Sequence, residues 1–376
     1  MSAPTRSTAS PCDALVTGGG TSGHALPAIA IMDRLVAAGH DPAALHYVGT
    51  ERGIEARLLP PTGYSFTLLD VVGLQRSFTR RNVAFVPKLV RATLRARALV
   101  RRLRPAVVVN VGGYASMPAT VAARLCKVPV VVVSYDLVPG LASKLSARFA
   151  TATAAAFPGS SLPRAHPTGA PIRPEIIAIE RSSQRAAARA ELGVPDDRFL
   201  VVVFGGSLGA KALNEATATL VEHWSGRADV AVHHVVGDRW LAEVPPSREA
   251  PEGIMYRVIG YEDRMPQLYA ASDLMITRAG ASTIAELAAT GTPAIVVPWP
   301  DAAENHQLAN ARTLSDRGAA VLVEQHDLTA ERLEQLIDGF IADPTSLQAI
   351  ADRARSEGER HRGDSLIELI DLVAAR

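Results

Sequence analysis

The fold is decided by the stretch Phe199-Leu200-Val201-Val202-Val203-Phe204-Gly205-Gly206-Ser207-Leu208-Gly209-Ala210, an apolar run that turns through glycines into a helix-like segment. Glycine lets the backbone come close to a ligand in conformations that other residues avoid. A helix start leaves N–H groups without partners and carries a partial positive charge. We therefore expect this turn to bind phosphate groups.

A second small-residue turn opens a helix in the same half of the chain, Arg278-Ala279-Gly280-Ala281-Ser282-Thr283-Ile284-Ala285-Glu286. Two helix starts in one half of the chain suit a diphosphate. Glu286 comes one and a half turns into the second helix, where its carboxylate could accept hydrogen bonds from ribose hydroxyls. Together the turns predict a nucleotide-diphosphate site without obvious metal ligands.

Length and composition limit the class of protein. A chain of 376 residues suits two domains, and 48% hydrophobic with 20% charged residues is typical of a globular protein. The net charge of +1 gives no general attraction to nucleic acid, and Cys12 and Cys126 are too few for a disulfide framework. We expect a protein of the cytoplasm, because no apolar run resembles a membrane span or a secretory signal.

The first half begins with another glycine turn, Gly18-Gly19-Gly20-Thr21-Ser22-Gly23-His24, between an expected strand at 13–17 and an expected helix at 27–38. The spacing Gly18-x-Gly20-x-x-Gly23 matches the dinucleotide fingerprint. The acid that this fingerprint needs after the next strand is Glu51, which comes late. An NAD site therefore stays open as an alternative.

Two further features of the first half follow expected strands. Gly112-Gly113-Tyr114 comes after a strand at 106–111, and Asp136 comes after a strand at 128–133. The carboxyl edge of an α/β sheet is where ligands bind, so Asp136 is a candidate for chemistry. The alternative is an aspartate that only caps a helix or lies in a loop.

A long basic stretch contains no Asp or Glu between residues 71 and 135, and arginines alternate with apolar side chains between 74 and 104. One interpretation is a solvated basic helix face. The other is a surface that rests on anionic lipid, with apolar residues in the interface and cations on the headgroups. This surface would consist of Leu74, Phe78, Arg80, Arg81, Phe85 and Lys88.

The alternation of strands and helices predicts an α/β protein of two Rossmann-like, doubly wound parallel-sheet domains that face a cleft. In the second half we expect strands at 199–204, 231–236, 254–259, 273–277, 293–297 and 319–323. Five prolines between 158 and 174 suggest a stiff connection. The predicted divisions are a disordered tail 1–12, domains 13–165 and 166–360, and a helix 361–376 that crosses back to the first domain.

Several motifs in order make the chain resemble the MurG family of UDP-N-acetylglucosamine transferases, over nearly its whole length. The motifs are Gly18 to Pro27, Gly49-Thr50-Glu51-Arg52-Gly53-Ile54-Glu55, Gly112-Gly113-Tyr114, Gly169-Ala170-Pro171-Ile172-Arg173, Gly205 to Ala210 with Asn214, Arg278 to Glu286, and Asn305-His306-Gln307 with Asn310-Ala311. The resemblance implies a GT-B fold and an inverting transfer of GlcNAc from UDP-GlcNAc to lipid I, giving lipid II for peptidoglycan. It also implies peripheral attachment to the cytoplasmic face of the inner membrane and no cofactor.

The resemblance assigns residues to both substrates. The donor would meet Arg173 and Ser207 at its diphosphate and the backbone near Tyr261 and Glu262 at its uracil. The remaining donor residues would be Ala281, Ser282, Thr283, Glu286, Asn305, His306 and Gln307. The acceptor's diphosphate would lie on Gly20, Thr21, Ser22, Gly23, Gly112, Gly113 and Tyr114.

The acceptor side departs from the family pattern, which usually shows His-Glu-x-Asn where this chain has Val133-Ser134-Tyr135-Asp136. Ser22 and Met117 also differ from the usual small residues. Inversion needs a base with a pKa near neutrality, and His24 is the first candidate. Asp136 is the second, or orients His24, while His24 could instead be only a phosphate-binding donor.

Two other functions remain open at this stage. One is a related UDP-sugar transferase with a different acceptor. The other is a UDP-GlcNAc 2-epimerase-like enzyme or a non-catalytic sugar-nucleotide binder, because intact donor motifs do not separate a transferase from an epimerase.

Overall fold

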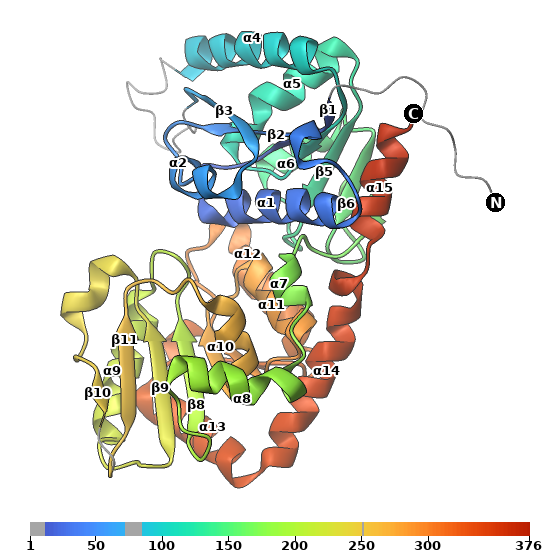
Figure 1. Ribbon diagram of the computed structural model, residues 1–376. Helices are drawn as coiled ribbons and strands as arrows, with labels where there is room; N and C mark the ends of the chain where they lie inside the picture. The colour runs from blue at the N-terminus through green and yellow to red at the C-terminus, as the bar shows by residue number, and fades with distance from the viewer. Residues whose placement is uncertain (1–11, 72–84, 250–251) are drawn as a thin grey trace. The chain divides into compact units, whose positions relative to one another are not determined.

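The computed structural model describes residues 12–71, 85–249 and 252–376 (Figure 1). The chain divides into two compact units, unit 1 with residues 1–174 and 363–376, and unit 2 with residues 175–362. Each unit is built on one seven-stranded sheet whose strands are almost all parallel. The predicted pair of doubly wound α/β domains is therefore confirmed, while the cleft between them stays a prediction.

The sheet of unit 1 has the order β3-β2-β1-β4-β5-β6-β7, with every neighbouring pair parallel. Its strands are β1 Cys12–Thr17, β2 Leu45–Thr50, β3 Ser65–Leu69, β4 Pro105–Asn110, β5 Val130–Ser134, β6 Ala152–Ala155 and β7 Ala165–Pro167. Its helices are α1 Ser22–Ala37, α2 Glu55–Leu58, α4 Phe85–Leu103, α5 Met117–Cys126, α6 Leu141–Ala147 and α15 Ser365–Ala374. All five residues of β5 are buried, as expected for a valine-rich strand covered on both faces.

The sheet of unit 2 has the order β10-β11-β9-β8-β12-β13-β14, and only the short β10 runs antiparallel to its neighbour. Its strands are β8 Phe199–Phe204, β9 Val230–Val235, β10 Arg248–Glu249, β11 Met255–Ile259, β12 Leu274–Thr277, β13 Ala294–Val296 and β14 Val321–Leu322. The remaining helices are α7 Pro174–Ile177, α8 Arg181–Leu192, α9 Lys211–His223, α10 Met265–Ala271, α11 Ala281–Thr290, α12 His306–Ser315, α13 Ala330–Ala342 and α14 Pro344–Arg362.

Both sheets reverse their winding direction at the strands that carry the glycine turns. In unit 1 the reversal lies between β1 and β4, and in unit 2 between β8 and β12. Ligands of open α/β sheets bind outside the carboxyl ends of the strands at this switch point. The predicted turns at Gly18 and Gly112 therefore adjoin in unit 1, and those at Gly205 and Gly280 follow neighbouring strands in unit 2.

The boundary between the units differs from the predicted division at residue 165. The strand β7 pairs with β6 in the first sheet, which keeps the chain in unit 1 as far as Pro174. The proline-rich stretch 158–174 is thus partly a strand and not only a connection. The predicted tail 1–12 lies outside the described residues except for Cys12, which begins β1.

The C-terminal helix α15 belongs to unit 1, where it lies beside α1, β5 and β6 (Figure 1). Its residues Leu366, Ile370 and Val373 are buried. Arg34 of α1 donates to the Gly363 carbonyl oxygen at 2.5 Å and to Asp364 Oδ1 at 3.1 Å, just before this helix begins. These contacts explain why the last residues fold with the first half of the chain.

Candidate functional site

The carboxyl edge of the unit 2 sheet carries almost all of the predicted donor residues. Ser207 follows β8, Tyr261 follows β11, Glu286 lies on the helix after β12, and Gln307 follows β13. Because these strands are parallel, their carboxyl ends meet at one edge of the sheet. Arg173 is the exception, since it belongs to unit 1.

The glycine turn after β8 is held tightly against the next strand along the sheet. Gly209 has φ +69°, and a Cβ there would lie 1.8 Å from the Val236 carbonyl oxygen, so no other residue fits without a shift. Asn214 of α9 donates to the same oxygen at 3.0 Å, and its Oδ1 lies 3.1 Å from His234 Nε2. The turn thereby keeps Ser207 exposed at the sheet edge.

The helix α11 begins at Ala281, directly after the neighbouring strand β12, and no side chain caps its first turn in the structure. Its first turn also has no acidic residue, so the N-terminal partial positive charge is not cancelled from within the helix. Glu286 is half-buried, and its Oε2 accepts a hydrogen bond of 2.8 Å from the Tyr269 hydroxyl. This arrangement can hold a phosphate at one end and a sugar hydroxyl further along.

The loop before α12 has an unusual backbone. Glu304 and Asn305 both adopt φ of 52°, a left-handed conformation that costs a non-glycine residue energy and often occurs at functional sites. His306 Nδ1 lies 2.7 Å from the Ala303 carbonyl oxygen, and Gln307 Oε1 accepts the Trp299 N–H at 2.9 Å. If Nδ1 donates to Ala303, His306 Nε2 is an acceptor, and the Gln307 amide nitrogen keeps its capacity to donate.

The loop after β11 is fixed by a buried carboxylate. Glu262 accepts from the backbone N–H and from Nε of Arg264 at 2.9 and 3.0 Å, and its Oε2 lies 3.1 Å from His233 Nε2. Burial raises the pKa of Glu262, but the contacts with His233 and Arg264 outweigh burial and bring it down to about 2. Because the Glu262 side chain is buried, its carboxylate is not available to a uracil, and the predicted contact with the backbone near Tyr261 and Glu262 stays a prediction.

In unit 1, His24 lies in the first turn of α1, after β1, and packs against the glycine turn that follows β4. A Cβ at Gly112 would lie 3.0 Å from His24 Cδ2, and one at Gly113 would lie 3.3 Å from its Cγ. His24 Nδ1 is 3.1 Å from the Thr21 hydroxyl oxygen. If Nδ1 carries the proton and donates to Thr21, Nε2 is free of its proton and can act as a base.

The segment that departs from the family pattern lies next to His24. The ring centroids of His24 and Tyr135 are 6.2 Å apart, and the Tyr135 hydroxyl donates to the Gly23 carbonyl oxygen. Burial lowers the pKa of His24, while the charge of Asp136 opposes this shift. Asp136 therefore acts on His24 through its charge, and the hydrogen-bond partner of His24 Nδ1 is the Thr21 hydroxyl.

The predicted cradle for the acceptor's diphosphate needs a correction at two of its amides. The Gly20 N–H donates to Glu55 Oε1 at 2.8 Å, and the Gly112 N–H donates to Asn110 Oδ1 at 2.7 Å. Both amides are satisfied inside unit 1 and do not point to an anion. Thr21 and Gly23 are exposed and stay candidates for the acceptor's diphosphate, while the Tyr114 ring covers Gly20.

Two residues of these surroundings were not among the predicted site residues. Glu55 is fully buried beneath the first glycine turn, and Tyr269 is fully buried behind Glu286. Glu55 is the last residue of the family motif Gly49 to Glu55, so the sequence itself indicated that this position matters. Tyr269 had no such signal, because it is one aromatic residue within an ordinary helix.

The predicted membrane surface is described only in part. Leu74, Phe78, Arg80 and Arg81 lie outside the described residues, and Phe85 begins α4. Lys88 Nζ lies 3.1 and 2.9 Å from the two carboxylate oxygens of Asp70, so its charge is largely compensated. In the described chain, no three His, Cys, Asp or Glu side chains gather as metal ligands, and no helix is long and apolar enough to cross a bilayer.

Comparison with known families gives two matches. The N-terminal domain of glycosyltransferase family 28 matches residues 14–155, and the C-terminal domain of the same family matches residues 200–365.

Curated relatives align over almost the whole chain. A protein of Desulforudis audaxviator is 37% identical over 374 residues, covering 96% of this chain and 98% of the relative. One of Alcanivorax borkumensis is 39% identical over 361 residues, with the same coverage of 96% and 98%. Both carry the name UDP-N-acetylglucosamine--N-acetylmuramyl-(pentapeptide) pyrophosphoryl-undecaprenol N-acetylglucosamine transferase.

Solved structures agree with this fold. MurG of Acinetobacter baumannii superimposes with a TM-score of 0.72 at 26% identity, covering 96% of this chain and 98% of that one. A UDP-GlcNAc 2-epimerase of Neisseria meningitidis reaches a TM-score of 0.65 at 13% identity, covering 96% and 99%, which shows a shared fold alone.

Proposed function

The chain belongs to glycosyltransferase family 28 and is a GT-B enzyme of that family, and from this premise we propose that it moves N-acetylglucosamine from its UDP conjugate to an undecaprenyl-pyrophosphoryl N-acetylmuramyl-pentapeptide. The observation that carries the proposal is the carboxyl edge of unit 2. There the turn of Ser207, the start of α11 and the loop of Gln307 follow strands that end together.

The donor would be held by complementary groups along this edge. The uncapped start of α11 supplies N–H groups and partial positive charge for the diphosphate. Glu286 supplies a carboxylate acceptor for ribose hydroxyls, and Gln307 supplies an amide donor for the sugar. Arg173 is the residue that the family resemblance assigns to the diphosphate, and a guanidinium suits that role by its charge and its planar set of donors.

The reaction is a single displacement that inverts the sugar's anomeric carbon. The acceptor hydroxyl oxygen forms the new bond to that carbon, the bond from the carbon to the diphosphate oxygen breaks, and UDP leaves with the electron pair. The hydroxyl proton passes to Nε2 of His24, which Thr21 holds in the required tautomer. Asp136 stabilises the imidazolium that results, since its charge raises the pKa of His24.

A membrane-facing role is supported by α4. Ala92, Ala96 and Leu99 pack into the core of unit 1, while Val90 and Leu94 on the other side are 54% and 60% exposed. The exposed arginines around them are Arg91, Arg95, Arg101 and Arg102. Apolar side chains surrounded by arginine suit an anionic lipid surface. We therefore propose that the enzyme is a peripheral membrane protein, on the cytoplasmic face that the family resemblance implies.

The α6 region supplies a second exposed apolar stripe in unit 1. Leu141, Leu145 and Phe149 recur at helical spacing and are 66%, 37% and 45% exposed, with Arg148 beside them. The stripe begins shortly after Asp136, on the acceptor side of unit 1. This position suits an acceptor that carries a long hydrocarbon chain.

The donor site is tested by steady-state kinetics on Glu286→Ala. Loss of hydrogen bonds to a charged acceptor costs about 1.5–3 kcal/mol each before compensation, so KM for UDP-GlcNAc should rise at least tenfold. The matched control is Glu215→Ala, an exposed glutamate of α9 in the same unit, which should leave KM unchanged. Equal KM and kcat for wild type and Glu286→Ala would remove the donor assignment.

A further inference from the structure

The carboxylate of Glu286 is fixed by a tyrosine that itself cannot reach a ligand. Tyr269 lies on α10 and is fully buried, and its hydroxyl donates to Glu286 Oε2 at 2.8 Å. A buried phenol needs a hydrogen-bond partner, and here the partner is the carboxylate predicted to bind ribose. The two residues are 17 positions apart and lie on consecutive helices.

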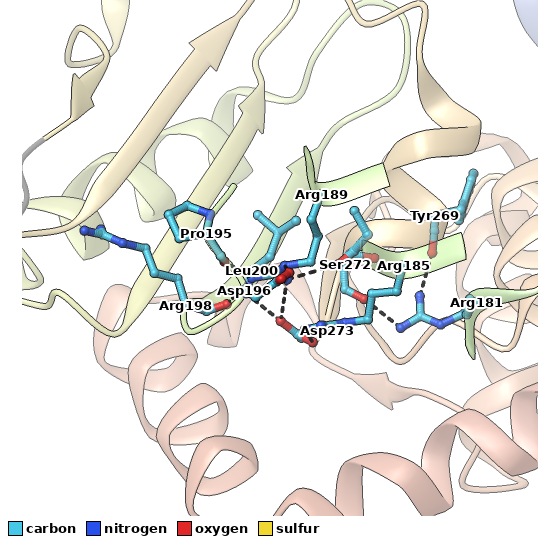
Figure 2. Close-up of polar contacts among 11 residues, drawn as sticks. Arg181, Arg185, Arg189, Pro195, Asp196, Arg198, Leu200, Tyr269, Ser272 and Asp273 are labelled. Atoms are coloured by element: carbon cyan, nitrogen blue, oxygen red, sulfur yellow. Dashed lines mark hydrogen bonds and ion pairs between the residues drawn. The ribbon is translucent and has the colours of Figure 1, made fainter. Parts of the chain in front are cut away.

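The backbone of Tyr269 is fixed as well. Figure 2 shows Arg181, at the start of α8, reaching the end of α10. Its Nη1 donates to the Tyr269 carbonyl oxygen at 2.6 Å, and its Nη2 donates to the Ser272 carbonyl oxygen at 2.6 Å. Burial lowers the pKa of Arg181 to about 10, which still leaves it charged at neutral pH.

Two more arginines of α8 bind Asp273, the residue after Ser272. Arg185 Nη2 lies 2.6 Å from Asp273 Oδ1, and Arg189 Nη1 lies 3.2 Å from Asp273 Oδ2 (Figure 2). Asp273 Oδ2 also accepts the N–H of Leu200 in β8 at 2.7 Å. The end of α10 is thus tied both to α8 and to the strand that leads into the Ser207 turn.

We propose that Tyr269 is a positioning residue for the donor: it fixes the plane of the Glu286 carboxylate and so the direction in which Glu286 accepts hydrogen bonds from the ribose of a uridine diphosphate sugar. This inference rests on the proposed function. A carboxylate fixed in advance does not lose side-chain freedom when the nucleotide binds, which increases affinity for the ribose. Tyr269 would contribute only through Glu286, since it is buried.

The experiment measures the affinity of Tyr269→Phe for UDP and for 2′,3′-dideoxy-UDP by calorimetry. UDP binding should weaken about fivefold to tenfold, the scale of one hydrogen bond to a charged group. Binding of 2′,3′-dideoxy-UDP should equal that of wild type, because this nucleotide has no ribose hydroxyls for Glu286. The matched control is Tyr64→Phe, which removes a phenol hydroxyl that donates to the Asp33 carboxylate in unit 1 at 2.6 Å, and it should change neither affinity.

A second measurement tests whether Tyr269 acts through Glu286. The double variant Tyr269→Phe/Glu286→Ala should bind UDP as Glu286→Ala alone does. Equal weakening for both nucleotides in Tyr269→Phe, or no weakening for either, would overturn the proposal. A wild type that does not prefer UDP over the dideoxy nucleotide would instead overturn the donor site itself, so the two failures are distinguishable.

Discussion

The carboxylate of Glu55 accepts the N–H of Gly20 at 2.8 Å and that of Thr50 at 3.3 Å, which ties the motif after β2 to the glycine turn after β1. Glu55 is fully buried, and among the described residues its Oε2 has no hydrogen-bond partner. A Cβ at Gly53 would lie 1.7 Å from this oxygen. The glycines of both motifs therefore make room for one buried carboxylate that shapes the turn leading to His24.

Glu55→Ala should loosen this turn without touching the donor site. An unpaired buried N–H costs about 1–3 kcal/mol, so thermal unfolding of unit 1 should shift to lower temperature. The kcat/KM for acceptor should fall while KM for UDP-GlcNAc stays the same. Glu55→Gln, which keeps an acceptor oxygen for Gly20, should restore part of the activity. Unchanged acceptor kinetics in Glu55→Ala would contradict a role in shaping the turn.

The pH profile of kcat/KM tests the base. His24 must be neutral to accept a proton, and burial lowers its pKa, so the acid limb should lie below the ordinary histidine pKa of about 6.5. Asp136 raises the pKa of His24, so Asp136→Asn should move the acid limb to still lower pH. His24→Ala should lower kcat by about 10²–10⁴-fold. If the acid limb lies at the same pH in Asp136→Asn and wild type, Asp136 does not act on the pKa of His24.

Membrane binding is tested with vesicles that contain anionic lipid. Replacing Arg91, Arg95 and Arg102 with glutamine should weaken binding by about 1 kcal/mol per charge at low salt. Lys88→Gln is the control, and its effect should be smaller because Asp70 already pairs with Lys88. Activity on a short-chain, water-soluble acceptor should survive in both variants. If the triple variant and wild type bind vesicles equally, the exposed face of α4 is an ordinary solvated face and does not bind lipid.

Acid should destabilise unit 2 through two buried histidines. Burial lowers the pKa of His234 and of His361 to about 3, so the unfolded chain binds two more protons than the folded one between that pH and the ordinary histidine pKa. Stability is then complete above about pH 6.5 and is lost as pH falls, by about 1.4 kcal/mol per pH unit for each histidine.

The measurement is denaturant unfolding of unit 2 between pH 7 and pH 5, a range chosen to lie above the carboxylate titrations. His361→Leu removes one of the two protons that the chain takes up on unfolding, so the free energy of unfolding should fall less steeply as the pH is lowered. His326→Gln is the control, since His326 is 72% exposed and should leave the slope unchanged. A slope that does not respond to His361→Leu would mean that this histidine is not the group that charges on unfolding.

The elements that the sequence predicted best are those whose own residues favour them. The run at 199–204 became β8 with the same bounds, because it is apolar and ends at glycines. The strands β3, β6, β7 and β10 were not predicted. Three of the four residues of the strand β6 are alanine, which forms strands poorly alone, and pairing with β5 and β7 stabilises it.

The placement of the candidate donor residues at the sheet edge was predictable wherever a motif follows a strand, as at Ser207 and Glu286. What could not be predicted is the set of contacts that join distant parts of the chain. The bond between Tyr269 and Glu286 depends on how α10 packs beside α11, and the bond between Glu55 and Gly20 depends on the neighbouring positions of β1 and β2. Such contacts follow from tertiary packing, which a local pattern does not encode.

The most direct test of the proposed transferase is product analysis with labelled UDP-GlcNAc and purified undecaprenyl-pyrophosphoryl N-acetylmuramyl-pentapeptide. We predict release of UDP with transfer of the label to the lipid, in a glycosidic bond of inverted configuration, and formation of both products at a rate about 10²–10⁴-fold lower in His24→Ala. Label that stays in a nucleotide sugar as UDP-ManNAc, or UDP release without a labelled lipid, would contradict the proposed transfer to this acceptor.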